Sequence, residues 1–280
     1  MFGRNYYALV AGLREYALDS DTKGFDVEAL KSEIIEAVSA SDARDIHLLY
    51  ACYDCENLVS LHYGSPSFNA LGNLTREELE TEYARPSKLP ERVAVVLRAY
   101  ADPEGEDAET VDVGRRFEKS LFEAYYEECA HSGSRFLREW SEFDRTLRNI
   151  LAATVARSEQ RPVDEAIVGG GDAAEQLRRS SAADFGLKGE YDYAEAVISA
   201  VNDEHNILAK EHRIDSVRWA YADALSAFDY FDIDAVMAYL VKINLVARWS
   251  LLDAARGREM FGRLLAELDG KESVAAATAK

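Results

Sequence analysis

The chain has 280 residues and a mass of 31.2 kDa, and its 32 basic and 51 acidic side chains give a formal net charge of -19. Binding to nucleic acid, or directly to an anionic lipid surface, is disfavoured because both depend on clustered cations. Hydrophobic residues make up 48% of the chain, which is too many for a disordered acidic protein and enough for a folded core. Length alone suggests two domains of about 150 residues each.

The cysteine count and the lack of long apolar runs indicate the cellular compartment of the protein. Cys52, Cys55 and Cys129 are the three cysteines of the chain, and an odd number cannot form a complete disulfide framework. This usage is typical of the reducing cytoplasm. The N-terminus lacks the apolar region of a signal peptide, and no window of about 18 residues is apolar enough to span a membrane. The sequence therefore predicts a soluble, cytoplasmic protein.

Strand signals are few. The best strand candidate is the segment 6–10, Tyr-Tyr-Ala-Leu-Val. The short apolar run over 93–97 fits a helix better, because charged residues flank it on both sides. The predicted fold class is therefore all-α.

The first third of the chain carries several helix signals. Asp26 is a suitable N-cap for a helix whose apolar residues follow at helical spacing. Ser41 is the expected cap of a second helix that runs to Gly64. Residues 75–78 match a capping box, in which a Thr hydroxyl and a Glu carboxylate each accept a hydrogen bond from a backbone N–H. A further helix is predicted over 91–100, after a loop bracketed by two prolines.

Two polar stretches interrupt the middle of the chain. Residues 101–112 contain six acids and no base, and they lack the ligand spacing of a calcium loop, so a solvated linker is predicted. A long helical stretch is expected over 113–160, and Gly169–Gly171 marks a second loop.

The C-terminal part has no glycine or proline between Glu190 and Arg256, and its apolar spacing predicts helices. Asp232 is the expected N-cap of one of them. Its apolar stripe consists of Val236, Leu240, Ile243, Ala247 and Leu251.

A weak internal repeat relates the segments 53–60, 145–152 and 244–251. Their fifth residues are Asn57, Asn149 and Arg248, which lie 92 and 99 residues apart. A period near one third of the length predicts three helical lobes rather than two domains. The expected divisions are 1–105, 106–190 and 191–270, followed by a flexible tail over 271–280.

Cys52 and Cys55 form a C-x-x-C motif, which Cys129 with His131, or His47, could complete as a zinc site. The pair lies inside a predicted helix, without a second paired motif and without the strand-to-helix context of a redox site. Buried helix cysteines are the preferred interpretation.

The pairs Glu204-His205 and Glu211-His212 are seven residues apart, so about 10.5 Å separates them along a helix, too far for one zinc ion. Neither pair fits the Glu-x-x-His pattern of a diiron site, and Glu128 to His131 is the chain's single match to it. The segment 184–186 and the three glycines lack the context of a kinase or a P-loop. The prediction is a protein that is not an enzyme, with no cofactor, metal or small-molecule substrate.

Six stretches carry a resemblance to a known family: 6–13, 55–58, 72–79, 181–187, 211–219 and 234–249. Together they resemble a bacterial family of uncharacterised proteins encoded among the genes of V-type ATPases. That family is similar to the V-type ATPase component called C in bacteria and archaea, or d in eukaryotes.

The resemblance implies a funnel of three helical lobes that sits on the membrane rotor ring and receives the rotor axle. The expected function is therefore a non-catalytic central-stalk adaptor, cytoplasmic and held at the inner membrane by protein partners. An assembly factor of the ATPase, or a metal-dependent enzyme, is the alternative. Asn57, Asn149 and Arg248 are expected either to pair helices or to line the funnel. The full set of candidate structural or interface positions is Asn57, Arg148, Asn149, Arg218, Trp219, Arg248 and Trp249.

Overall fold

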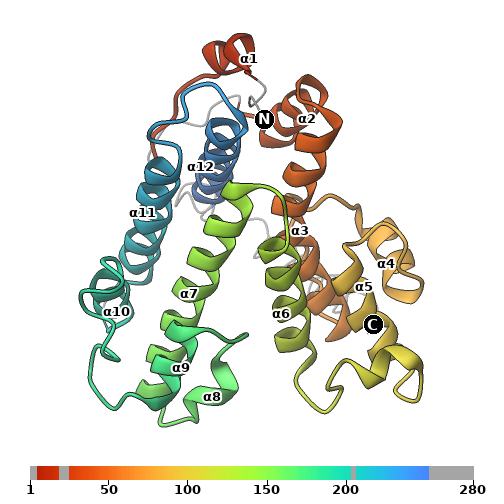
Figure 1. The fold of residues 1–280 in the computed structure, drawn as a ribbon, viewed down its shortest axis with the longest axis vertical. Helices are drawn as coiled ribbons and strands as arrows, with labels where there is room; N and C mark the ends of the chain where they lie inside the picture. The colour runs from red at the N-terminus through yellow and green to blue at the C-terminus, as the bar shows by residue number, and fades with distance from the viewer. Residues whose placement is uncertain (1–4, 19–24, 203–205, 252–280) are drawn as a thin grey trace, which may run out of the picture.

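The computed structural model describes residues 5–18, 25–202 and 206–251. Within these ranges it holds twelve α-helices, one 3-10 helix and no strand, so the all-α prediction is confirmed (Figure 1). The strand prediction over 6–10 is wrong, because Tyr7–Gly12 forms helix α1. A short apolar run cannot distinguish the two structures. Here the Tyr6 N–H donates to the Phe231 carbonyl, and the Tyr7 ring packs on that of Phe231.

The elements follow one another along the chain with connections of very different length, the longest of which precede α2, α4 and α10. They are α1 (Tyr7–Gly12), α2 (Val27–Ala37), α3 (Ala40–His62), α4 (Arg76–Ala84), α5 (Glu91–Ala101), η1 (Glu106–Glu109), α6 (Phe117–Ala130), α7 (Arg135–Ser158), α8 (Val163–Ala166), α9 (Asp172–Arg179), α10 (Ala194–Asn202), α11 (Ile207–Leu225) and α12 (Ile233–Leu251).

Most predicted helix starts are found in the structure. The side chains of Asp26 and Thr75 each accept a hydrogen bond from the backbone N–H three residues further on, and the capping box at Thr75 is complete. Asp232 accepts hydrogen bonds from the backbone N–H groups of Asp234 and Ala235 at the start of α12. The cap expected at Ser41 is wrong by two residues: Ser39 has the extended backbone of an N-cap, and Ser41 lies in the first turn of α3.

The helical stretch predicted over 113–160 is two helices, α6 and α7, separated by a turn at 131–134 that contains a glycine. The acidic stretch 101–112 contains the short η1, whose Asp107 accepts a hydrogen bond from Arg98 of α5 at 2.7 Å. Between 190 and 251 the described residues form α10, α11 and α12. Leu251 is the last described residue, and the predicted tail over 271–280 lies outside the described residues.

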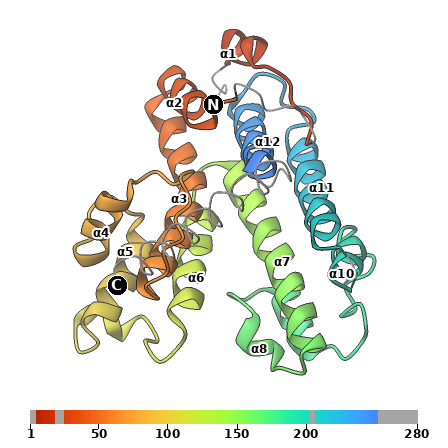
Figure 2. The same cartoon turned by 180° about the vertical axis from the view of Figure 1, so that it is seen from behind.

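The helices form two arms that diverge from a common end. Helices α1, α2 and α12 lie at that end, with α3 to α6 in one arm and α7 to α11 in the other (Figures 1 and 2). The buried apolar side chains separate into two clusters, and α3 contributes to both. Helix α6 packs with α3 and α5 in the first arm, although the predicted division at 105/106 assigns it to the second lobe. The division into three lobes stays a prediction.

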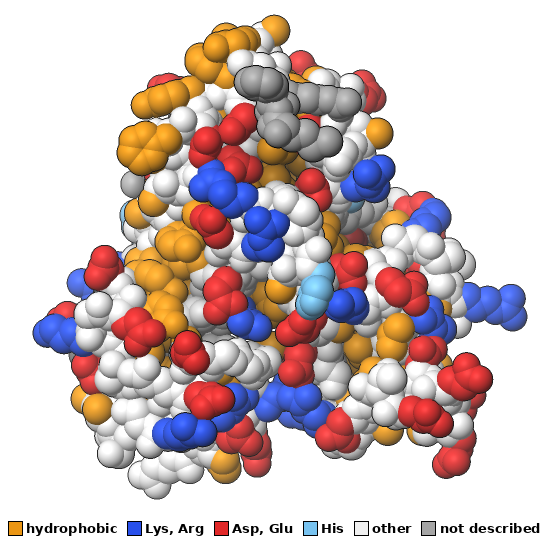
Figure 3. Space-filling view, in the orientation of Figure 1, with side chains coloured by type: hydrophobic (Ala, Val, Ile, Leu, Met, Phe, Trp, Pro, Cys, Tyr) orange, Lys and Arg blue, Asp and Glu red, His pale blue; other side chains and the backbone are white. Residues whose placement is uncertain are grey.

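Acidic side chains are spread over the face drawn in Figure 3, as expected from the net charge. Across the described ranges, no helix combines the length and the hydropathy needed to cross a membrane.

Candidate functional site

A cavity of about 390 Å³, lined by both charged and apolar side chains, lies where the two arms meet. Its walls come from α3, α6, α7, α11 and α12. Three of the sequence-predicted positions line it, namely Arg148 on α7, Arg218 on α11 and Arg248 on α12. Arg148 and Arg218 are 70 positions apart in the chain, and Arg218 and Arg248 are 30 positions apart, but all three line the same cavity. Each of them forms an ion pair with a carboxylate there.

Asp144 connects α7 to two neighbouring helices. Its carboxylate accepts a hydrogen bond from Nε of Arg148 at 3.0 Å and one from the Tyr126 hydroxyl at 2.7 Å, and Nε of Arg218 lies 3.5 Å away. Burial alone would raise the pKa of Asp144, but the charges of Arg148 and Arg218 and the hydroxyl bond overcome that effect and hold the pKa below its usual value. Asp144 is therefore an anion at neutral pH.

Asp215 joins α11 to α12 in the same way. Its side chain is 0% exposed, and one oxygen accepts from Nη1 of Arg218 at 2.9 Å. The other oxygen accepts from Arg248 and, at 2.9 Å, from the indole N–H of Trp249. Arg248 also pairs with Glu211, one turn earlier on α11. A single buried carboxylate thus holds three donors from two helices.

Arg148 extends the network to the other arm. Its Nη2 lies 3.4 Å from a carboxylate oxygen of Glu56 and 3.4 Å from the Cys52 sulfur, both on α3. Its guanidinium also lies over the Phe122 ring of α6, 5.1 Å from the centroid. Burial would lower the pKa of Arg148, but the neighbouring Tyr126 and Asp144 raise it well above its usual value.

The network is saturated with internal partners. Every buried side-chain nitrogen and oxygen of residues 5–18, 25–202 and 206–251 has a hydrogen-bond partner. Alternating charges with good geometry restrict how α3, α7, α11 and α12 can move relative to one another. The arrangement can therefore fix the angle between the two arms.

Asn57 and Asn149 lie elsewhere and make a matching pair of contacts. Asn57 on α3 donates to the carbonyl of Asn69 at 2.9 Å and accepts from the N–H of the same residue. Asn149 on α7 donates to the carbonyl of Val168 at 2.9 Å and accepts from its N–H at 2.9 Å. Both asparagines are 3% exposed. Each amide thus replaces a peptide group and holds one loop residue against its helix.

Trp219 is the candidate that the structure places apart from these contacts. It is half-buried on α11, and its ring faces Lys242 of α12, with the ammonium 5.4 Å from the centroid. A cation–π contact at the surface of two paired helices is worth about 0.5–1 kcal/mol. Its neighbour in the prediction, Trp249, is instead tied to Asp215.

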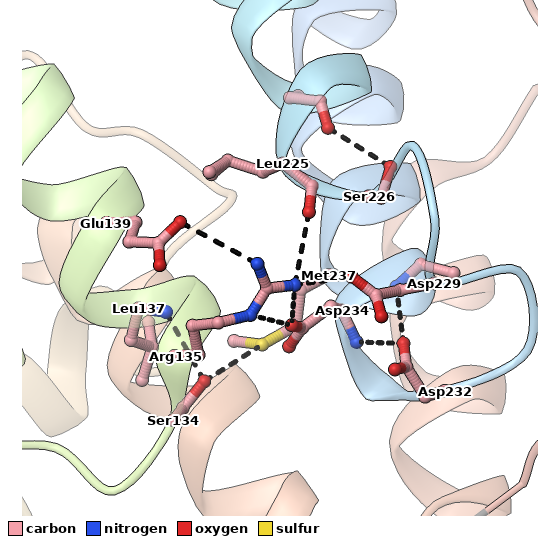
Figure 4. A network of polar contacts seen from close by, with 12 residues as sticks. Ser134, Arg135, Leu137, Glu139, Leu225, Ser226, Asp229, Asp232, Asp234 and Met237 are labelled. Atoms are coloured by element: carbon pink, nitrogen blue, oxygen red, sulfur yellow. Dashed lines mark hydrogen bonds and ion pairs between the residues drawn. The ribbon is translucent and has the colours of Figure 1, made fainter.

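The described part of the chain does not assemble the cysteine and histidine zinc site. Among those residues, the one group of three potential ligands within 4.8 Å of one another is Asp229, Asp232 and Asp234. The Arg135 guanidinium enters this group, donating to Asp234 at 2.6 and 3.0 Å and to Asp229 (Figure 4). Arg135 supplies the positive charge that compensates these carboxylates, so the three aspartates connect α7 to the turn before α12. Glu204 and His205 lie outside the described residues.

Burial explains the cysteines. Cys55 and Cys129 are buried, and desolvation raises the pKa of Cys55 well above its usual value and that of Cys129 to about 12. We expect iodoacetamide at pH 8 to modify at most one thiol, Cys52, in the native chain, and all three in denaturant, as counted by mass spectrometry. Rapid native modification of two or more thiols would contradict this assignment, because iodoacetamide reacts with accessible thiolates and a buried, protonated thiol reacts slowly.

A comparison with protein families gives one match. The model described as "Protein of unknown function (DUF2764)" matches residues 3–272. The chain belongs to this family. The comparisons with curated proteins and with solved structures gave no match. The description of DUF2764 states no activity or partner, so the link to V-type ATPases stays a prediction.

Sequence reasoning missed the acidic half of the network in this DUF2764 protein. Asp144 and Asp215 were not singled out, although each has an arginine four or three residues later in its own helix. That spacing places both charges on one helix face. Such pairs on helices rich in apolar residues were the available signal, but 51 acidic residues made any single pair inconspicuous.

Proposed function

We propose that this protein is a non-catalytic adaptor of the central stalk of a V-type ATPase, which couples the rotor axle to the membrane rotor ring. Its partners are then the axle proteins and the ring, with no direct contact to lipid or nucleic acid. The protein works in the cytoplasm, held at the inner membrane by these partners. The basis is the resemblance of the sequence to a family encoded with such ATPases, together with one observation in the structure.

That observation is the matching role of Asn57 and Asn149. Each lies in a long helix that begins with a serine cap, and each holds both backbone groups of one residue in a loop that follows. The same device at positions 92 residues apart supports an internal repeat. The third landmark, Arg248, has a different role in the central network. An internal repeat is what the resemblance to the funnel-shaped ATPase component implies.

The central network suits a part that transmits force. A coupling element must resist deformation between its two attachment points, and densely packed helices have low compressibility. The ion pair of Arg218 with Asp144 joins α11 to α7, and that of Arg248 with Asp215 joins α12 to α11. These pairs oppose sliding of the helices, because any displacement would leave the buried carboxylates without their partners.

The test is to purify the intact ATPase from a bacterium that encodes this protein, through a tag on a catalytic component, and to image it by electron microscopy. We expect one copy of the chain between the axle and the ring. Its absence from the intact complex would refute the adaptor function. Its presence only in partial complexes would identify an assembly factor instead. The untagged strain is the control for unspecific capture.

A further inference from the structure

A second cavity, of about 460 Å³, lies between α6, α7 and the segment 161–168. Its lining contains five basic residues and two acidic ones, whereas the chain as a whole has a net charge of -19. Figure 3 shows Lys and Arg side chains gathered in the notch between the lower ends of α6 and α8. The basic residues are Arg116, Lys119, Arg145, Arg161 and Arg148, the last of which is already paired with Asp144 and Glu56 in the central network, and the acidic ones are Glu118 and Glu165.

Among the five basic residues of this cavity, Lys119 is the one whose positive charge is least neutralised by its contacts. Its ammonium donates to the carbonyl of Asp164 at 2.9 Å, an acceptor that has no full charge. Partial burial and the neighbouring charges of Arg115 and Arg178 lower its pKa, whereas Asp164 and Glu123 act in the opposite direction. A partly desolvated ammonium whose hydrogen bond goes to a neutral carbonyl would be stabilised by an anion beside it.

The arginines retain donors for a ligand. Arg145 pairs with Glu142, Arg116 with Glu118 at 3.8 Å, and each of these is a contact to one carboxylate. Arg161 pairs with Glu159 at the surface. A guanidinium has five N–H donors, so one carboxylate does not exhaust it.

Helix α6 adds its N-terminus at the same place. Its first residues line the cavity, and its N-cap, Arg116, gives no side-chain hydrogen bond to the first turn. The N-terminal N–H groups and the helix dipole therefore favour an anion there. Phe122, Leu151 and Val155 supply an apolar wall beside the charges.

We propose that this cavity binds a polyphosphate group, either as inorganic pyrophosphate or as part of a nucleoside diphosphate or triphosphate. A single carboxylate ligand would meet one or two of the cations, whereas a compact group with several negative charges meets cations from α6, α7 and the following segment together. The volume suits a small molecule, and the apolar wall can contact its organic part. This inference goes beyond the adaptor function and does not rest on it.

The test is isothermal titration calorimetry of the full chain at low ionic strength with three probes: pyrophosphate, ADP and adenosine. We expect one saturable site for pyrophosphate or ADP, and no binding of adenosine. Tighter binding of ADP assigns a nucleotide, and tighter binding of pyrophosphate assigns the inorganic ion. Binding of adenosine as strong as that of ADP, or no saturable binding of either phosphate, would overturn the proposal.

Three variants locate the site. Lys119→Gln and Arg161→Gln should each weaken the binding at least about tenfold, the effect of losing one charge-assisted hydrogen bond. Lys188→Gln is the matched control, since Lys188 is an exposed lysine that pairs with Glu195 away from this cavity. Arg161 is largely exposed, so its variant should keep the native melting temperature. Wild-type affinity in both test variants, or an equal loss in the control, would refute the site.

Discussion

The substitution Asp215→Asn is expected to lower the free energy of unfolding by about 3–5 kcal/mol. Asp215 is fully buried and holds Arg218, Arg248 and Trp249 at once. Asparagine has nearly the same shape but no charge, so the guanidinium groups of Arg218, 17% exposed, and Arg248, 40% exposed, lose part of their compensation. Chemical denaturation followed by circular dichroism measures the effect.

Asp164→Asn is the matched control for this variant. Asp164 also pairs with an arginine, Arg178 at 2.7 Å, but its side chain is 75% exposed. An exposed pair contributes about 0–1 kcal/mol, because water screens it. Equal effects of the two substitutions, or a loss below about 1 kcal/mol for Asp215→Asn, would show that the network does not stabilise the junction.

The substitution Asn149→Ala should cost about 2–4 kcal/mol, because it leaves the partly buried N–H and C=O of Val168 without their partners. We expect a similar loss for Asn57→Ala, which frees the two backbone groups of Asn69. Asn149→Asp separates the two bonds: a carboxylate can still accept from the N–H but cannot donate to the carbonyl. The buried carboxylate would also face the Val168 carbonyl oxygen without a proton between them, so Asn149→Asp should be no more stable than Asn149→Ala.

Asn202→Ala is the control for the asparagine series, since Asn202 is an exposed residue at the end of α10. Its substitution should change stability by less than about 0.5 kcal/mol. If Asn149→Ala also falls within that range, the contact to the loop carries no stability. Unequal losses for Asn57→Ala and Asn149→Ala would weaken the argument from a repeat, because equivalent positions should respond alike.

Much of the local structure was predictable from the sequence. Asp26, Thr75 and Asp232 cap helices as expected, because a cap acts on N–H groups only two or three residues away. The start of α3 was predicted two residues too late, because Ser39 and Ser41 both carry a hydroxyl that can cap a helix. The strand prediction over 6–10 was wrong because the signal there was a run of apolar residues too short to show a period.

The central site was predictable only in part. Arg148, Arg218, Arg248 and Trp249 were singled out from the sequence, but nothing there showed that they meet. Asp144, which bridges Arg148 and Arg218, belongs to another helix than Arg218, and its importance depends on that contact. The basic cavity beside α6 was equally hidden, because its cations come from separate segments of a chain with a net charge of -19.

The sequence by itself determined the helical class, the caps of several helices and the acidic surface, since these follow from spacing, capping and composition within a few residues. The tertiary structure decided which charges are buried together, which loop each asparagine holds and where basic residues collect. Those outcomes depend on contacts between residues far apart in the chain, and a periodic pattern contains no information about which helix faces which. A carboxylate on a helix surface and one at the junction of α7, α11 and α12 have the same sequence signature, and only packing gives them different energies.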